Sequence, residues 1–387
     1  MGKQGIGYKE ISEYYEHLIR SGQLRPGQML PTEPELARRH EVTRTTLRRA
    51  FSILVDKGLV VKRSGHGTFI APAQDLAARE RGHVAVITRQ SFAEPVARRK
   101  EGHTVYSYAS CSYYQFLEAV TGTLGRFGRL FRIYYHVETP EALSELTASI
   151  RDNGDCGILA IGIWTQDAMN AICDLEKPTV FVDSLSEPSR ADVVNPNNHQ
   201  GFADVAELLL ETTGGPLAFV GSGIWIEGSQ QEERFRGFLE GHQIRKRRFD
   251  EKYRLFASRM IPEDGRRLAL DLLNLDPLPT GVACSDDGLA FGVIDRLRRE
   301  GVAVPSKISV AGFGNSVYCL MTSPSITSVS PDRYEMGLRA VELLEKRIED
   351  PQRAPVLVQV PTRLTHRQST IPAASADMRS DILDVVL

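Results

Sequence analysis

The stretch that decides the fold runs from Leu30 to Ile70 and reads LPTEPELARRHEVTRTTLRRAFSILVDKGLVVKRSGHGTFI. Its middle predicts a helix with one buried face, because apolar residues recur at the i, i+3, i+4 and i+7 spacing of such a face: Leu47, Ala50, Phe51 and Leu54. Arg44, Thr45 and Arg48 lie off that stripe, and the two arginines share one exposed face. Such a helix suits the major groove of DNA, where Arg pairs bidentately with guanine.

The residues on either side of this helix complete a winged helix-turn-helix. A shorter helix and a turn precede it, and the segment 60–70 predicts a two-stranded β-wing. Gly65 and Gly67 give that wing the positive φ and the close backbone approach that its turn needs. Two residues leave alternatives open. Thr43 could serve mainly as the N-cap of the helix, and His66, within the glycine turn, could simply face solvent.

Over about residues 7 to 71 the segment resembles the GntR-type winged helix-turn-helix family of bacterial transcription regulators. The residues that carry the resemblance follow one another in order: Tyr8, Gly22-x-Leu24-x-Pro26-Gly27, Leu30-Pro31-Thr32-Glu33, Glu35-Leu36-Ala37, Val42-Thr43-Arg44-Thr45-Thr46 and Gly65-His66-Gly67-Thr68-Phe69. The resemblance implies a set of contacts with operator DNA: Thr43, Arg44, Thr45, Thr46 and Arg48 from the helix, and Gly65, His66 and Gly67 from the wing. The family often has an Arg between Glu33 and Glu35, where this chain has Pro34, so one phosphate or base contact differs.

Length and charge predict a chain of two or more parts. The chain has 387 residues, enough for two or three domains. Its net charge of −2 hides an asymmetry: residues 1–70 hold 12 Lys and Arg against 7 Asp and Glu, which leaves 35 against 42 for the rest. A basic head on an acidic body fits contact with nucleic acid confined to the N-terminal part.

Several classes of protein are disfavoured by what the sequence lacks. The five cysteines form no CxxC pair and no Cys/His cluster, which argues against a zinc site or a disulfide framework. The start, MGKQGIGYKE, has no apolar core of a signal peptide, and no apolar run approaches the length of a membrane span. We therefore expect a cytoplasmic protein with no metal, no cofactor and no membrane contact.

The body reads as an α/β fold. After a polar, alanine-rich linker at 72–81, which could be flexible or helical, short apolar strands alternate with amphipathic helices. This pattern argues for parallel sheets covered on both faces. Roughly nine units are too many for one small sheet, so we expect two lobes with a cleft between them. The predicted domains are 1–71, the winged helix-turn-helix, 82–369, a two-lobed effector and dimerisation domain, and 370–387, a tail. Candidate strands are 83–88, 131–135, 157–163, 179–183, 217–221, 253–257, 281–284 and 308–313.

The body resembles the effector domain of the LacI/GalR repressor family, which shares the type I fold of periplasmic sugar-binding proteins with its doubly wound parallel sheets. The segments that carry this resemblance are Phe181-Val182-Asp183, Pro216-Leu217-Ala218-Phe219-Val220-Gly221, Arg234-Phe235-Arg236-Gly237-Phe238, Ser285-Asp286-Asp287-Gly288, Ile308-Ser309-Val310-Ala311-Gly312-Phe313 and Pro361-Thr362-Arg363-Leu364. A GntR-type head on such a body is similar to the arabinose repressors of that architecture.

Ligands of such sheets lie beyond the carboxyl ends of the strands, where polar residues are the candidates. Asp183 ends one strand, Arg234 opens the helix that follows another, and Asp286 follows a third. These match positions where the family holds its ligand. Asp286 stands where the family often has Asn, and the Asp that usually follows Gly-Phe is Gly314 here, with Asn315 next.

Other residues at strand ends are weaker candidates for the effector site. A sugar needs hydrogen-bonding groups for its hydroxyls and an aromatic face for its C–H surface. Trp164 and Trp225 each follow a strand and could stack on a ligand or serve in ordinary packing. Thr88 and Arg89 end the first strand and could reach the ligand from that side. The segment 90–112 could be a lid or a dimer arm.

The sequence gives no support for an enzyme, because it has no nucleophile elbow, no Walker loop and no informative His–Ser–carboxylate set. Asp287, beside Asp286, is better explained as a helix-start carboxylate. The sequence therefore predicts a homodimeric DNA-binding regulator, namely a repressor of carbohydrate uptake or catabolism genes that a sugar releases from its operator. Two alternatives stay open: an effector that is a nucleoside, a purine or another small metabolite, and action as an activator or a co-repressor-dependent repressor.

Overall fold

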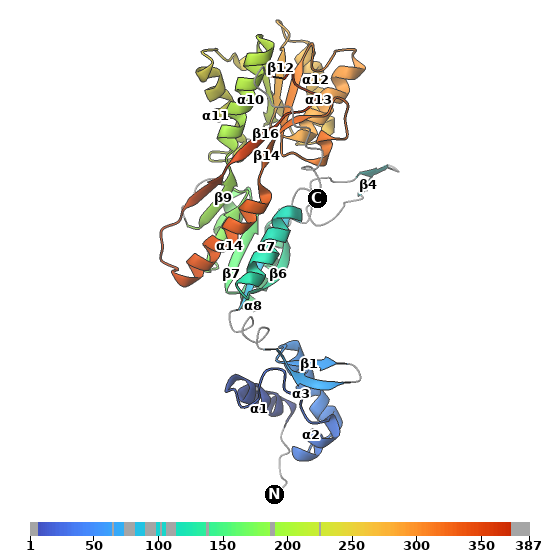
Figure 1. Ribbon diagram of the computed structural model, residues 1–387, viewed down its shortest axis with the longest axis vertical. Helices are drawn as coiled ribbons and strands as arrows, with labels where there is room; N and C mark the ends of the chain where they lie inside the picture. The colour runs from blue at the N-terminus through green and yellow to red at the C-terminus, as the bar shows by residue number, and fades with distance from the viewer. Residues whose placement is uncertain are drawn as a thin grey trace. The chain divides into compact units, whose positions relative to one another are not determined.

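The computed structural model describes residues 7–63, 66–72, 82–89, 98–100, 103–105, 114–136, 139–185, 190–223 and 226–372. The chain divides into two compact units, residues 1–83 with 124–130 and residues 84–123 with 131–387. We use "head" for residues 7–72 and "body" for the two sheets and their helices that follow (Figure 1).

In the described part of the head, three helices precede a two-stranded antiparallel wing. The elements are α1 (Tyr8–Arg20), α2 (Glu33–Arg39), α3 (Arg44–Asp56), β1 (Val60–Arg63) and β2 (Gly67–Ile70). The predicted stripe on α3 is buried, with every member at 2% exposure or less, and it packs on Ile11, Tyr15 and Ile19 of α1. Burial of each large apolar side chain contributes about 1.5–3 kcal/mol. Packing of this stripe therefore holds α3 in place, and the predicted winged helix-turn-helix is confirmed.

The first lobe of the body is a six-stranded sheet in the order β15-β9-β8-β7-β3-β6. The pairs from β15 to β3 are parallel, and β7, β8 and β9 are buried at every position. Continuous burial is typical of parallel strands that are covered on both faces. The elements are β3 (His83–Arg89), α7 (Tyr114–Arg126), β6 (Leu130–His136), α8 (Pro140–Asp152), β7 (Gly157–Ile161), α9 (Gln166–Cys173), β8 (Thr179–Val182), β9 (Asp192–Pro196), α14 (Arg333–Glu349) and β15 (Leu357–Val360).

The second lobe is a six-stranded sheet in the order β11-β10-β12-β13-β14-β16, with helices on both faces (Figure 1). All pairs are parallel except β14 with β16. Side chains alternate along β10, so that Leu217 and Phe219 meet α10 and α11 while Ala218 and Val220 meet α12 and α13. The elements are α10 (Asn198–Thr213), β10 (Leu217–Ser222), α11 (Gln230–Ile244), η1 (Glu251–Tyr253), β11 (Arg254–Ala257), α12 (Pro262–Leu273), β12 (Gly281–Cys284), α13 (Asp287–Arg299), β13 (Ser309–Phe313), η2 (Val317–Cys319), β14 (Thr327–Pro331) and β16 (Thr362–Thr365).

Among the described residues, the chain passes between the two sheets three times: from β9 to α10, from β14 to α14 and from β15 to β16. The helix α14 leaves the second sheet and packs on β7, β8 and β9 of the first. Each lobe is therefore built from segments that are far apart in the sequence. The expectation of an α/β body with two doubly wound sheets is confirmed.

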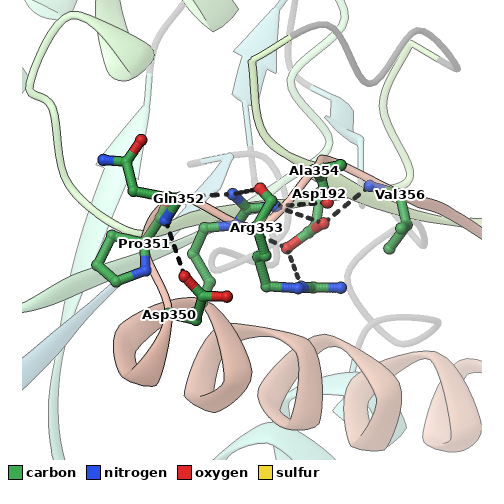
Figure 2. A network of polar contacts seen from close by, with 8 residues as sticks. Asp192, Asp350, Pro351, Gln352, Arg353, Ala354 and Val356 are labelled. Atoms are coloured by element: carbon green, nitrogen blue, oxygen red, sulfur yellow. Dashed lines mark hydrogen bonds and ion pairs between the residues drawn. The ribbon is translucent and has the colours of Figure 1, made fainter.

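A buried ion pair fixes the turn by which α14 returns to the first sheet (Figure 2). Asp192, at the start of β9, is fully buried and accepts two bonds from Arg347 of α14, each 2.9 Å long. The same carboxylate accepts from Arg353 at 2.8 Å and from the backbone N–H of Val356 at 2.9 Å. Bidentate Arg–carboxylate geometry adds direction to the attraction, so Asp192 sets where β15 joins β9.

All eight candidate strands are present, but the sequence did not indicate β9, β14, β15 and β16. A short hairpin, β4 (Arg98–Lys100) with β5 (His103–Val105), lies within the segment 90–112. The rest of that segment, most of the linker, Trp225 and residues beyond 372 lie outside the described residues. The packed chain continues past 369, because Thr370 is buried and the N–H of Ile371 donates to Ser309 Oγ at 3.3 Å. In the described part, no helix is both long enough and apolar enough to cross a bilayer.

Candidate DNA-binding face and effector site

Thr43 is the N-cap of α3, which begins at Arg44. The hydroxyl of Thr43 accepts from the N–H of Thr46 at 3.2 Å and shares a hydrogen bond of 2.9 Å with the hydroxyl of Thr46. The N-cap role that the sequence left open for Thr43 is therefore realised. Arg44, Thr45 and Arg48 are exposed, as the predicted stripe requires. The start of α3 thus offers a row of donors and hydroxyls to solvent.

Arg48 has a partner that the sequence did not reveal. Its Nε donates to Glu33 Oε2 of α2 at 2.8 Å, and Lys62 Nζ of the wing donates to Glu33 Oε1 at 3.1 Å. The hydrogen bond from Arg48 lowers the pKa of Glu33, and Lys62 lowers it further, against an opposing effect of burial. Only Nε of the guanidinium is used, which leaves both Nη groups of Arg48 without a bond to the described residues.

The wing turn places His66 and Gly67 at an exposed tip. The N–H of His66 donates to the carbonyl of Arg63 at 3.0 Å, and both turn residues are exposed. Gly67 has φ of 108°, and a Cβ there would lie 2.8 Å from Cε of Met29, so a larger residue would strain the backbone and displace Met29. Gly65 lies outside the described residues.

In the body, a glycine sets the position of Arg234. A Cβ at Gly237 would lie 1.9 Å from the carbonyl oxygen of His199, so α11 can approach the start of α10 this closely only with glycine there. The close approach brings Arg234 Nε to 2.8 Å from Asn198 Oδ1. The guanidinium also lies over the ring of Phe313, 3.7 Å from its centroid. Arg234 is 7% exposed, so its charge is held in a nearly dry position.

A continuous chain of hydrogen bonds joins the two lobes. Trp164 Nε1 donates to the carbonyl of Asp183 at 2.7 Å, and Gln230 Nε2 donates to Asp183 Oδ1 at 2.6 Å. Arg234 then donates to Gln230 Oε1 at 3.3 Å and to the carbonyl of Ser285 at 2.7 Å. Three predicted residues, Trp164, Asp183 and Arg234, are thus brought together. The sequence did not single out Gln230, which precedes Arg234 by one helical turn; the i, i+4 spacing indicates its contact with Arg234 but not its bond to Asp183.

Asp286 follows Ser285 and caps α13, since its Oδ1 accepts from the N–H of Gly288 at 2.7 Å. Burial, and next the nearby charge of Asp287, raise the pKa of Asp286 to about 7. Asp287 does more than start the helix: its carboxylate accepts from the hydroxyl of Ser328 at 2.6 Å and from the N–H of Ser316 at 2.7 Å. Asp287 is therefore a structural anchor, and Asp286 is the carboxyl that titrates near neutrality.

The remaining candidates stand apart from this chain of bonds. Asn315 Oδ1 accepts from Arg367 at 2.7 Å, and Thr88 is 2% exposed within β3. Among the described residues, neither is hydrogen-bonded to Asp183 or Arg234. Arg89 lies in β3, but its side chain is outside the described part. Within the described residues, no group of three or more His, Cys, Asp or Glu side chains could hold a metal ion.

Two family models match the chain. Residues 7–70 match the bacterial regulatory proteins of the gntR family, and residues 217–370 match the periplasmic binding protein-like domain. The chain joins a GntR-type head to a LacI-like body. Both resemblances drawn from the sequence are thereby confirmed.

Relatives of this GntR/LacI-type regulator are themselves transcriptional regulators and not enzymes. The HTH-type transcriptional regulator GanR of Bacillus subtilis (strain 168) is 27% identical over 222 residues, which are 55% of this chain and 66% of that protein. The arabinose metabolism transcriptional repressor of Geobacillus stearothermophilus is 23% identical over 349 residues, 88% of this chain and 91% of that protein.

Solved structures support the fold of the regulator. The transcriptional regulator CelR in complex with cellobiose has a TM-score of 0.63 at 19% identity and covers 88% of this chain and 100% of its own. A LacI family regulator from Enterococcus faecium with bound ribose has a TM-score of 0.58 at 21% identity, and the match covers 75% of this chain and 99% of that one. At such identities these structures establish the fold and no ligand.

Proposed function

We propose that this regulator is a repressor whose hold on operator DNA, in the cytoplasm, is released by a sugar bound in the body. The observation that carries the proposal is the chain of hydrogen bonds from Trp164 to Ser285. It runs along strand ends and joins the two lobes. Two relatives support the sugar class, because one is named for arabinose metabolism and one was solved with cellobiose.

The chemistry of the chain suits a neutral polyol. Asp183 and Asp286 can accept from hydroxyls, Arg234 can donate to ring or hydroxyl oxygens, and Trp164, 38% exposed, can cover a C–H face. Arg234 already holds Asn198 and Ser285, so it is preorganised and loses little freedom on binding. A ligand that bonds to Asp183 of the first lobe and Asp286 of the second would favour one arrangement of the lobes. Coupling of about 1–3 kcal/mol would change DNA affinity by 5- to 150-fold.

For the DNA contact we propose the exposed start of α3 at the major groove and the wing tip at the minor groove. The helix would supply Thr43, Arg44, Thr45, Thr46 and Arg48, and the wing would supply Gly65, His66 and Gly67. Exposure of Arg44 and Arg48 beside a buried stripe is the support for the helix. Pro34 lacks the guanidinium that the family often carries there, so Arg44 and Arg48 bear more of the affinity.

We propose a homodimer, since a two-fold operator requires two heads. The edge strand β6 presents alternate apolar side chains, Phe131, Ile133 and Tyr135, that are 37%, 41% and 53% exposed. An apolar row on an open sheet edge is costly for a monomer. A second copy of the chain would cover it.

Thermal unfolding in the presence of arabinose, ribose, cellobiose and, for the alternative effector class, adenosine and hypoxanthine tests the effector. A ligand at 100 times its Kd raises the free energy of unfolding by about 2.7 kcal/mol. The proposal expects one sugar to raise the melting temperature and to weaken binding to a DNA duplex that the protein enriches from a random library. A shift with the purine compounds alone would replace the sugar by the alternative class. Tighter DNA binding with the sugar would replace release by co-repression.

A further inference from the structure

We propose that Glu33 is a positioning residue that presents Arg48 to a base pair and so sets the sequence discrimination of the head. The inference rests on the proposed DNA-binding function. Glu33 belongs to α2, Arg48 to α3 and Lys62 to the wing, so one carboxylate joins the three elements that surround the DNA-binding face. Glu33 itself is not among the residues proposed to contact DNA, so its effect on DNA binding would act through Arg48.

The bond to Glu33 leaves the Nη groups of Arg48 exposed and able to bind a base. Glu33 Oε2 takes Nε of Arg48 at 2.8 Å, and the Arg48 side chain is still 66% exposed. A guanidinium held at Nε keeps its Nη edge for the paired acceptors of guanine. A free Arg would have to give up much rotamer freedom to reach that position, whereas a held one gives up less. The carboxylate thus selects one direction for a long and otherwise mobile side chain.

Charge explains why a carboxylate is tolerated so close to DNA. Alone, Glu33 would repel phosphates, but Lys62 Nζ lies 3.1 Å from its second oxygen. Glu33, Arg48 and Lys62 together carry one net positive charge. Ion pairs between exposed groups contribute little to stability, so holding the fold together is a poor reason for this arrangement.

A matched pair of variants separates positioning from general electrostatics. Glu33→Gln and Glu35→Gln each remove one negative charge from the first turn of α2. Among the described residues, the side chain of Glu35 is hydrogen-bonded to its own helix start alone, accepting from the N–H and the hydroxyl of Thr32 at 2.9 and 2.8 Å. Gln also completes such a capping box, so Glu35→Gln preserves the helix. Both variants should bind unselected DNA more tightly, with a salt slope steeper by up to about 0.9. Only Glu33→Gln should lose discrimination.

The test compares affinity for the duplex that the wild-type protein enriches from a random library with affinity for an unselected duplex of equal length. We expect the ratio to fall about tenfold or more in Glu33→Gln and to stay within about twofold in Glu35→Gln. In an Arg48→Ala background, Glu33→Gln should cause no further fall, because it acts through Arg48. Lys62→Gln should weaken binding to both duplexes and keep the ratio.

Equal ratios in Glu33→Gln and Glu35→Gln would overturn the inference, as would a full additional loss in the Arg48→Ala background. A wild-type protein that enriches no sequence would instead refute the proposed function. Circular dichroism melting of each variant keeps the comparison valid. If Glu33→Gln does not fold, the Lys62→Gln variant provides the test. A fall in its ratio of affinities for the enriched and unselected duplexes that is as large as the fall in its affinity for the enriched duplex would contradict the inference.

Discussion

Replacement of Asp286 by Asn should stabilise the body at neutral and alkaline pH but not at acid pH. The carboxyl of Asp286 is partly buried and caps α13 through its bond with Gly288. Asn caps a helix as well as Asp does, so Asp286→Asn keeps the cap and removes the ionisation. The variant therefore isolates the cost of the charge.

The sign follows from the two pKa values. In the folded body the pKa of Asp286 is about 7, against 3.8 for the group outside the fold. Stability from the bound proton is complete below about pH 3.8 and is lost as the pH rises to about 7. At 1.36 kcal/mol for each pKa unit, the loss is at most about 4 kcal/mol. Asp286 keeps some contact with water, which screens its charge, so we expect about 1–2 kcal/mol.

Urea unfolding between about pH 3 and pH 8 measures this effect, because all other groups titrate alike in both proteins. The advantage of Asp286→Asn should grow from pH 4 to pH 7 and then level off. Asp264→Asn is the control of opposite sign. Bonds from the N–H of Arg259 and the hydroxyl of Ser258 lower the pKa of Asp264 despite its burial, so the deficit of that variant should grow as the pH rises through about 4. A constant difference for Asp286→Asn from pH 4 to pH 8 would refute the raised pKa.

Further variants test the other parts of the regulator. Arg48→Ala should weaken binding to the enriched duplex by about 1–3 kcal/mol, and unchanged binding by a folded variant would contradict its role. Arg234→Ala should weaken effector binding by about 2–5 kcal/mol in calorimetry while ligand-free DNA binding survives; wild-type effector affinity would count against the site. Arg347→Ala should lower the free energy of unfolding by about 3 kcal/mol, because buried Asp192 loses its bidentate partner and keeps only Arg353 and the N–H of Val356. Arg339 is exposed, so Arg339→Ala should change the free energy of unfolding by less than about 1 kcal/mol. Equal losses in Arg339→Ala and Arg347→Ala would contradict the importance given to the buried ion pair. The isolated segment 82–372, which keeps buried Thr370 and the bond from Ile371, should fold and dimerise by light scattering, and Ile133→Lys should make it monomeric; a dimer that tolerates this change would exclude β6 as the interface.

The head was predictable from sequence because its signals are local. The stripe on α3 and the glycine turn of the wing each fall within a dozen residues. Strands of the body were found where apolar runs are unbroken. They were missed where a buried polar residue interrupts the run, as in β14, where Ser328 bonds with Asp287 41 residues away. Periodicity cannot anticipate a partner at that separation.

The residues of the candidate effector site were likewise predictable from local signals and not from distant partners. Asp183 could be located because it directly follows a strand, and Arg234 because it lies in the second turn of the helix that follows β10. Gln230 could not be assigned, since its bond to Asp183 spans 47 residues and two sheets. No local pattern marks a role for Glu33, because its partners lie 15 and 29 residues further on in other elements. Polar residues acquire their roles from tertiary neighbours, which a single sequence does not encode locally.

The return of the chain to the first sheet also governs how this regulator is made on the ribosome. The head is contiguous in sequence and can fold as soon as it leaves the ribosome. The strand β9 cannot pair with β15 until β15 has been synthesised, roughly 160 residues later. At ordinary elongation rates that wait lasts roughly 10–30 s. For most of that time β7, β8 and β9 lack the cover of α14, and until β15 is made the outer edge of β9 is open. The nascent first lobe is therefore a natural client for chaperones, and slow translation between residues 200 and 360 prolongs its exposure to aggregation.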